Sequence, residues 1–403
     1  TIKSNVGTGY SIYLSPDGVS GFLDKASTEY VFENVEGSFY VFSKDGTANY
    51  LTSNNDDTRA NFNGSDKYSP DAQWELLTKQ DLIDGLSAAS TINPMNATFL
   101  IPGFDFNRND SRNGKWEGGP VCGGHNDYRQ CAEKWNTNFD VYQELTGLPN
   151  GLYKLSVQGF YRAGNIGSTS TEQNAFLYAN GVETPLMNIN TEYIASVPID
   201  KTSACDAFVN GLYRDNSIFV NVTDGKLRVG IRKETLIAAD WACFDNFHLT
   251  YYGNNVTISN PYTGTGKFYL QNVATNEYLQ GGGFNGLQAM LGNGIEFELV
   301  KKYDGIYHIR NVGINPEGND YLSDERRLDD QPIDFIITET YEGSKVYNIA
   351  TQSGFLLTSV AGNSNNGERY KDLNDFTLDE WYGVTPGSTF KQSWTGVYAN
   401  SLH

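Results

Sequence analysis

Residues 239–252 alternate apolar and other side chains, as a β-strand with one buried face does. A carboxylate, Asp245, lies inside this apolar pattern. An unpaired carboxylate there costs several kcal/mol unless a cation, a set of backbone donors or solvent compensates it. The earlier segment 101–106 has a matching pattern that carries Asp105. We therefore expect 101–106 and 239–252 to be the first and last strands of one β-sheet module.

Between these two ends lie further segments with the period of a strand. Residues 151–160 follow a Pro-Asn turn and place their apolar side chains on one face. The same alternation recurs in the segments 175–181, 217–222 and 226–232. Two sheets packed face to face would bury one face of each strand. We therefore predict a β-sandwich over residues 93–253.

The C-terminal part of the chain, 262–386, repeats itself. Tyr269, Tyr307 and Tyr347 follow one another at intervals of about 40 residues, each in a strand-like segment before a polar turn and a second strand. One such hairpin cannot bury its own apolar face, so three units predict a β-trefoil-like module. Residues 1–88 carry the pattern in two copies, which favours a partial module of the same kind, ending in a short helix at 79–86. The alternative is that these strands complete a barrel with other parts of the chain.

These predictions make the chain all-β, with a central jelly-roll sandwich and trefoil-like modules on either side. Residues 131–164, in which Leu-Pro-Asn-Gly-Leu-Tyr leads into the strand at 151–160, resemble the galactose-binding-like modules, a fold of many carbohydrate-binding modules. The C-terminal repeats resemble the scaffold of ricin-B-like lectins, although the Q-x-W triplet of those lectins is missing. The combination resembles proteins that glycan-degrading bacteria export. It implies binding of a glycan or polysaccharide.

The resemblance also implies a calcium ion between the first and last strands of the sandwich. Asp105 and Asp245 are the candidate ligands, because calcium takes carboxylate and carbonyl oxygens. Such an ion would be structural and would hold the two ends of the module together. The competing interpretation is that both are solvated or hydrogen-bonded aspartates at strand ends.

A sugar site needs an aromatic platform and a few polar groups that pair with hydroxyls. The candidate ligand-binding residues are Trp116, Trp135, Asn136, Phe160, Tyr161, Arg162 and Trp241. For each of them, packing in the core is the competing interpretation. Trp135 and Arg162 are favoured, because one precedes a strand in a polar loop and the other lies where the central strand gives way to a loop.

Charge and motifs limit the classes of function. The net charge of −19 argues against nucleic acid and anionic membranes as partners. No apolar run is long enough to insert into a membrane. We find no nucleophile elbow, phosphate-binding loop, zinc-protease motif or convincing dinucleotide fingerprint, so we expect no enzymatic activity. The abrupt start at Thr1 leads us to expect a secreted or cell-surface protein whose targeting segment is absent from this chain.

Four cysteines do not make a disulfide framework. Cys122 and Cys131 flank a glycine-rich loop, and the sequence leaves open whether they form a bridge; Cys243 is expected to be a buried free thiol. The first functional hypothesis is non-catalytic, extracellular carbohydrate binding. The alternatives are an accessory region of a larger glycoside hydrolase and a surface adhesin or scaffold that binds proteins. The sequence indicates neither the sugar nor the oligomeric state.

Overall fold

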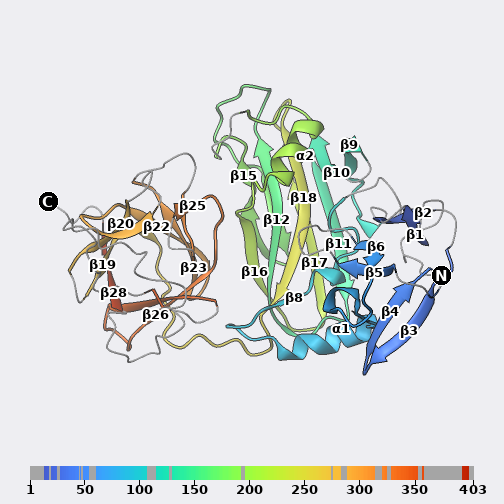
Figure 1. Cartoon of the computed structure of the whole chain (residues 1–403). Coiled ribbons are helices and arrows are strands. Elements are labelled where there is room, and N and C mark those ends of the chain that lie inside the picture. The colour runs from blue at the N-terminus through green and yellow to red at the C-terminus, as the bar shows by residue number, and fades with distance from the viewer. Residues whose placement is uncertain are drawn as a thin grey trace. The chain divides into compact units, whose positions relative to one another are not determined.

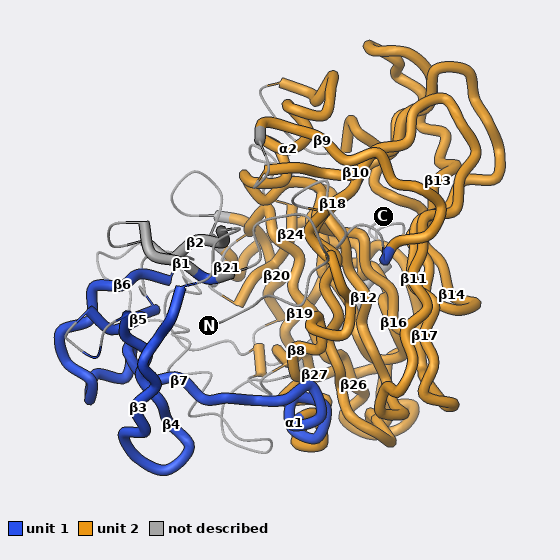
Figure 2. Tube along the Cα trace, turned by 90° about the vertical axis from the view of Figure 1, so that its right-hand side faces the viewer, with its two compact units in different colours: residues 1–85, 108–115 blue, residues 86–107, 116–403 orange. Residues whose placement is uncertain are grey.

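A computed structural model gives the fold of the chain (Figure 1). It describes residues 13–17, 20–24, 28–44, 46, 49–53, 60–106, 115–126, 129–191, 196–273, 276–282, 288–313, 320–324, 328–352, 356–357 and 393–398. Strands make up 49% of the structure and helices 9%, which confirms an all-β protein. Two compact units are distinguished, residues 1–85 with 108–115 and residues 86–107 with 116–403 (Figure 2). The division into three modules stays a prediction.

The first unit contains two small sheets. One has the order β1 (Tyr13–Asp17), β2 (Ser20–Asp24), β6 (Ala60–Gly64) and β5 (Tyr50–Ser53). The other has the order β3 (Val31–Glu36), β4 (Phe39–Ser43) and β7 (Trp74–Glu75). Phe42, Leu51 and Phe62 form its buried core. After the 3-10 turn Pro70–Ala72 comes α1 (Lys79–Gly85), which confirms the predicted short helix.

The second unit contains a sandwich of two sheets, which are antiparallel except that β15 pairs with β12 in parallel. The larger sheet has the order β15 (Met187–Asn188), β12 (Gly151–Arg162), β18 (Trp241–Tyr251), β10 (Arg129–Trp135) and β9 (Val121–Asn126), with β16 (Asn216–Val222) on β12 and β8 (Met95–Asn96) on β18. The smaller has the order β11 (Phe139–Thr146), β17 (Lys226–Lys233), β13 (Ala175–Ala179) and β14 (Val182–Pro185). Phe139 of β11 stacks on Phe244 of β18, with ring centroids 6.5 Å apart, so the sheets meet face to face.

The alternating segments at 151–160, 175–181, 217–222, 226–232 and 239–252 are all strands in the structure, as predicted. The prediction for 101–106 is wrong. These residues form a turn, and the partner of β18 at this end is β8, where Asn96 pairs with Thr250. The turn still lies against β18, because Phe247 N donates a 2.9 Å hydrogen bond to Phe104 O.

Helix α2 (Lys201–Val209) packs on the face of the larger sheet that carries Cys131 and Cys243. It begins at a capping box, in which Ser203 N donates to the Asp200 side chain. The 3-10 turns Leu86–Ala88 and Thr98–Leu100 complete the helical elements of the described part of this unit.

The four cysteines are free thiols. Cys122 is paired with Ala132 across β9 and β10, and Cys131 is paired with Gly123. Because side chains alternate along a strand, Cys122 and Cys131 lie on opposite faces of the sheet. Cys131 Sγ instead lies 3.2 Å from Cys205 Sγ and 3.3 Å from Cys243 Sγ. Cys243 is fully buried, as predicted.

The C-terminal part forms a ten-stranded sheet. Its strands are β19 (Gly266–Asn272), β20 (Tyr278–Gly282), β21 (Gln288–Gly292), β22 (Phe297–Tyr303), β23 (Ile306–Asn311), β24 (Tyr321–Leu322), β25 (Leu328–Asp329), β26 (Phe335–Glu339), β27 (Tyr347–Thr351) and β28 (Ser393–Tyr398). Because β22 pairs with both β19 and β23, six of these strands close into a ring. The repeat tyrosines 269, 307 and 347 lie in β19, β23 and β27. A trefoil arrangement of both flanking modules stays a prediction.

Candidate functional site

Three of the predicted ligand-binding residues lie in one row across the larger sheet. Arg162 on β12 is paired with Trp241 on β18, and Trp241 is paired with Trp135 on β10. Paired residues point to the same face, so the three side chains come together. Arg162 Cζ lies 4.9 Å from the ring centroid of Trp241 and 5.5 Å from that of Trp135. The guanidinium therefore makes cation–π contacts with both indole rings.

Arg162 is a buried cation with spare hydrogen-bonding capacity. Arg162 is 4% exposed, and its Nε donates a 3.1 Å hydrogen bond to Gly164 O. Nη1 has no hydrogen-bond partner among the residues that the structure describes. Burial lowers the pKa of Arg162, but an arginine remains charged in proteins. A desolvated guanidinium with an unused donor favours an incoming acceptor oxygen.

Arg162 also lines a pocket of about 400 Å³. Its walls include Ile166, Val197 and Ile199, whose side chains are exposed although they are apolar. Serine, threonine and asparagine side chains complete the lining at positions 168, 169 and 190. Trp135, beside Arg162, is 48% exposed. Apolar walls, a few polar groups and an exposed indole are the usual composition of a small-molecule site.

The Trp241 ring, which Arg162 contacts, is itself held by several neighbours. It is 2% exposed, and its Nε1 donates a 2.9 Å hydrogen bond to Glu133 Oε2. Glu133 in turn lies 3.1 Å from Lys201 Nζ at the start of α2. Phe160 packs edge-on against the indole, with centroids 5.0 Å apart. The contacts of Trp241 fix the ring on which Arg162 rests.

A buried ion pair holds the loop next to the site. Lys233 and Asp240 form an ion pair with each other, and their side chains are 2% and 0% exposed. Asp240 Oδ2 also accepts hydrogen bonds from Ile237 N and from the Tyr161 hydroxyl, each at 3.1 Å. Asp240 O accepts a 2.8 Å hydrogen bond from Asn136 N. The charge pair therefore determines where the chain enters β18 and where β10 ends.

The other predicted ligand-binding residues are packed inside. Phe160 and Tyr161 are 0% exposed, and Trp116 is 4% exposed, with its Nε1 donating to Gly103 O at 2.9 Å. Asn136 links two loops, because its Oδ1 accepts a 2.8 Å hydrogen bond from Ala239 N. A ligand role for these residues stays a prediction, and the candidate site consists of Trp135, Arg162 and the pocket.

Asp105 and Asp245 lie close enough to repel one another. Burial raises the pKa of Asp245 well above its usual range, the hydrogen bond from Asn246 N opposes this, and the charge of Asp105 raises it further. Asp245 is buried and Asp105 is half-buried, and two neighbouring carboxylates fit the oxygen chemistry of calcium. Within the described ranges, no group of three or more His, Cys, Asp or Glu side chains is arranged to hold a metal ion. Any remaining ligands would be backbone carbonyls or water.

No family model matches this chain. No curated protein matches it either. Among solved structures, the carbohydrate-binding module TmCBM61 in complex with β-1,4-galactotriose is 14% identical, with a TM-score of 0.23, and the match covers 38% of this chain and 97% of that one. The receptor-binding domain of botulinum neurotoxin type G is 9% identical, with a TM-score of 0.20, over 72% and 94% of the two chains. The lysenin pore is 12% identical, with a TM-score of 0.21, over 62% and 93%. TM-scores this low do not establish a shared fold.

The sequence reasoning missed the pocket beside Arg162 and the helix next to it. The pocket walls come from two loops, around 166–169 and 197–199, which have no regular pattern. The helix had a detectable signal, since Asp200 and Ser203 have the spacing of an N-terminal cap. In the part of the chain that the structure describes, no helix is long and apolar enough to cross a membrane.

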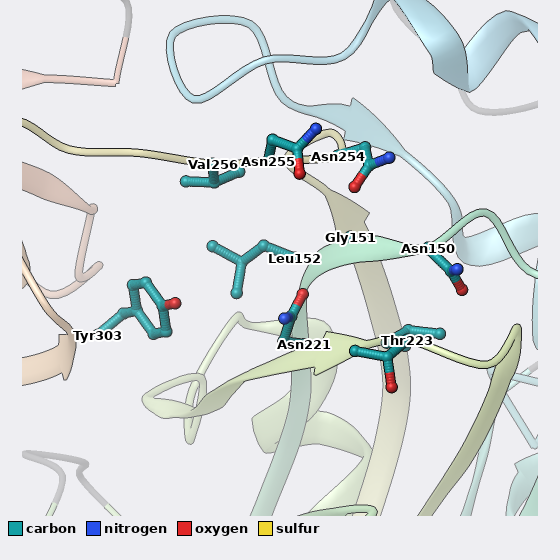
Figure 3. Close-up of a pocket in the computed structure, with 10 residues that line it drawn as sticks. Asn150, Gly151, Leu152, Asn221, Thr223, Asn254, Asn255, Val256 and Tyr303 are labelled. Carbon is teal, nitrogen blue, oxygen red and sulfur yellow. The ribbon is translucent and has the colours of Figure 1, made fainter.

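A second hollow, of about 360 Å³, lies near the opposite end of β12 (Figure 3). Asn150, Asn221, Asn254 and Asn255 surround it, and Leu152 faces Tyr303 across it. Its lining contains no charged side chain. It therefore offers less to orient a ligand than the pocket beside Arg162.

Proposed function

We propose that this chain is a non-catalytic glycan-binding protein and that the sugar binds at the end of the sandwich beside Trp135 and Arg162. The observation that carries the proposal is the contact of the Arg162 guanidinium with two indole rings, next to a pocket with apolar walls. Trp135 would stack on the C–H face of a sugar ring. Arg162 would donate to a ring or hydroxyl oxygen through Nη1.

The setting that we propose is extracellular, on a secreted or cell-surface protein, with calcium as a structural ion. The alternatives are an accessory region of a larger glycoside hydrolase and an adhesin that binds proteins. An accessory region would bind the same glycans, and only the full-length polypeptide would distinguish it. A protein-binding adhesin would show no binding to free glycans.

A glycan array, probed with the wild type and with single variants, tests the site. Trp135→Ala and Arg162→Gln are each expected to weaken binding about tenfold or more, because one removes the platform and the other a buried charged donor. The matched control is the pair Tyr142→Ala and Arg228→Gln, since Arg228 Cζ lies 3.5 Å from the Tyr142 ring centroid on the smaller sheet. Binding that survives both site variants, or that the control pair also abolishes, would contradict this site. Silence of the wild type across the array would favour the protein-binding alternative.

Thermal unfolding with and without chelator tests the calcium proposal. Without an ion, Asp245 prefers its protonated form in the folded state, because its pKa is raised. The associated stability is present below the unfolded pKa and is lost as pH rises towards the folded pKa. At neutral pH a bound calcium would reverse this loss, by about 2.7 kcal/mol at a hundredfold excess over its Kd. EDTA is therefore expected to lower the Tm of the wild type.

The control for the chelator is Asp245→Asn. Asparagine removes the charge that calcium needs and also the cost of burying it, so EDTA is expected to leave the Tm of this variant unchanged. In EDTA at pH 7 the variant should melt above the wild type. A wild-type Tm that does not respond to EDTA would rule out the structural ion.

A further inference from the structure

A smaller and more polar pocket, of about 250 Å³, lies between the sandwich and the C-terminal strands within the second unit. Gln173 lines it from the loop before β13. Arg310 of β23 and Asp320, which precedes β24, line it from the other side. None of these residues belongs to the site beside Arg162, and nothing in the proposed function uses them.

Three side-chain atoms of this pocket have unused hydrogen-bonding capacity. Asp320 Oδ1, Gln173 Oε1 and Arg310 Nε are all buried atoms without a hydrogen-bond partner in the described part of the chain. Asp320 is only 7% exposed, and burial raises the pKa of its carboxyl although Arg310 beside it acts in the opposite direction. A buried polar atom without a partner is unfavourable, and a ligand that supplies the missing hydrogen bond removes that penalty. Three of them around one pocket indicate a place where a polar ligand fits.

The charges around the pocket restrict the ligand. Asp215 is already engaged, by Lys302 Nζ at 2.9 Å and by the Tyr321 hydroxyl at 2.6 Å. Of the remaining charged groups, Asp320 and Asp330 outnumber Arg310, so an anion would be repelled. Arg310 Nη2 donates to Asp320 Oδ2 at 3.4 Å, which places a positive charge where a metal ion would have to bind that carboxylate. A neutral ligand is neither repelled by the two carboxylates nor in competition with Arg310 for Asp320.

We propose that this pocket is a second binding site and that it takes one neutral, hydroxyl-rich ring, such as an uncharged sugar or a cyclic polyol. A hydroxyl group donates one hydrogen bond and accepts others, so a ring of hydroxyls matches two unused acceptors and one unused donor. The volume is below the roughly 300–1,000 Å³ of pockets for drug-sized ligands, which suits a single ring. The site depends on both parts of the second unit, because the sandwich supplies Gln173 and the C-terminal strands supply the charged pair.

The test is ligand-observed NMR on the full chain carrying Trp135→Ala, so that the first site does not contribute. The probes are glucose, galactose, mannose and inositol, with glucuronate as the charged comparison. At least one neutral ring is expected to bind saturably, and glucuronate is expected to bind more weakly. Adding Asp320→Ala should weaken binding about tenfold or more, and Gln173→Ala should weaken it several-fold. Asp304→Ala is the control, because its exposed carboxylate lies in the same part of the chain, forms an ion pair with Lys301 at 2.7 Å and does not line the pocket.

Three results would overturn the proposal. One is that no neutral ring binds the Trp135→Ala chain, whatever the wild type binds. Another is that binding survives both Asp320→Ala and Gln173→Ala in proteins that melt normally. The third is that glucuronate binds better than every neutral ring. Failure of the first site leaves these results unaffected, because that site is disabled in every sample.

Discussion

Replacing Asp240 with alanine is expected to lower the free energy of unfolding by about 3–5 kcal/mol, because the Lys233 ammonium would remain buried without its partner. Lys233 is 2% exposed and Asp240 is fully buried. The substitution also removes the acceptor of Ile237 N and of the Tyr161 hydroxyl. Chemical denaturation followed by tryptophan fluorescence measures the loss, since the loop that Asp240 holds leads directly into Trp241.

The control for Asp240→Ala is a double variant, Lys233→Met with Asp240→Leu. Replacing both charges with apolar groups of similar size is often neutral for stability, so this variant should recover most of what the single substitution loses. Alanine keeps the main-chain acceptor for Asn136 N, but it removes the side-chain bonds that hold this loop next to Trp135, so the single variant should also bind glycan more weakly. A loss below about 1 kcal/mol for Asp240→Ala would show that the charge pair does not support the site.

Replacing Asp334 with alanine is expected to have an effect of the same size, about 3–5 kcal/mol. Asp334 Oδ2 accepts from Lys154 Nζ at 2.5 Å and from the Tyr252 hydroxyl at 3.1 Å, both of which belong to the sandwich part of the chain. Its Oδ1 lies 2.9 Å from His308 Nε2 on β23. The carboxylate therefore joins strands of the sandwich to the C-terminal strands, and its loss removes the carboxylate that forms an ion pair with Lys154. Calorimetry of the full chain measures the change.

The same carboxylate predicts a pH dependence. Burial raises the pKa of Asp334, but Lys154 and His308 more than reverse this, so the pKa lies well below its usual range. Asp215 behaves alike, because His308 and Lys302 outweigh its burial. For a depressed pKa, the stability is present above the unfolded pKa of about 3.9 and is lost as pH falls further. The free energy of unfolding of the wild type should therefore decrease as the pH is lowered from about 5.

Asp334→Asn is expected to make the loss of stability at acid pH less steep, because of Asp215 and Asp334 only Asp215 can then still bind a proton. Asp304→Ala, which removes an exposed carboxylate, should cost less than about 1 kcal/mol and leave the pH profile unchanged. Equal acid sensitivity of wild type and Asp334→Asn would contradict the role given to Asp334.

The sequence predicts the strands of the sandwich well, because alternation along residues 151–160 or 226–232 is a local property. It fails at 101–106, where Gly103 and Phe106 adopt positive φ values of 65° and 46° and turn the chain. A pattern of apolar residues does not reveal such a reversal when an aromatic residue occupies the left-handed position.

For the candidate site, the sequence indicates single residues but not which of them lie next to one another in the fold. The sequence places Arg162 at the end of a strand, as the structure does. It places Trp135 in a loop before a strand, and this is wrong, because Trp135 is the last residue of β10. The contact between the two residues depends on the register of β10 and β12 against β18, which only the folded sheet determines. The unused atoms of Asp320 and Gln173 are a property of tertiary packing, and 48 acidic residues in the sequence give no reason to choose Asp320.

The three thiols beside α2 have a consequence for handling the protein. Burial raises the pKa of Cys243, and contact with Cys131 together with burial raises that of Cys205. Contact with Cys205 lowers the pKa of Cys131, but contact with Cys243 and burial more than reverse this. Since only the thiolate attacks a disulfide or an oxidant, the native protein keeps these cysteines unreactive in oxidising surroundings. Unfolding exposes all of them at once, and Cys131 can then form a disulfide with any of the other three cysteines. Recovery of native protein after denaturation should consequently depend on a reductant, and apparent Tm values measured in air should vary with the heating rate.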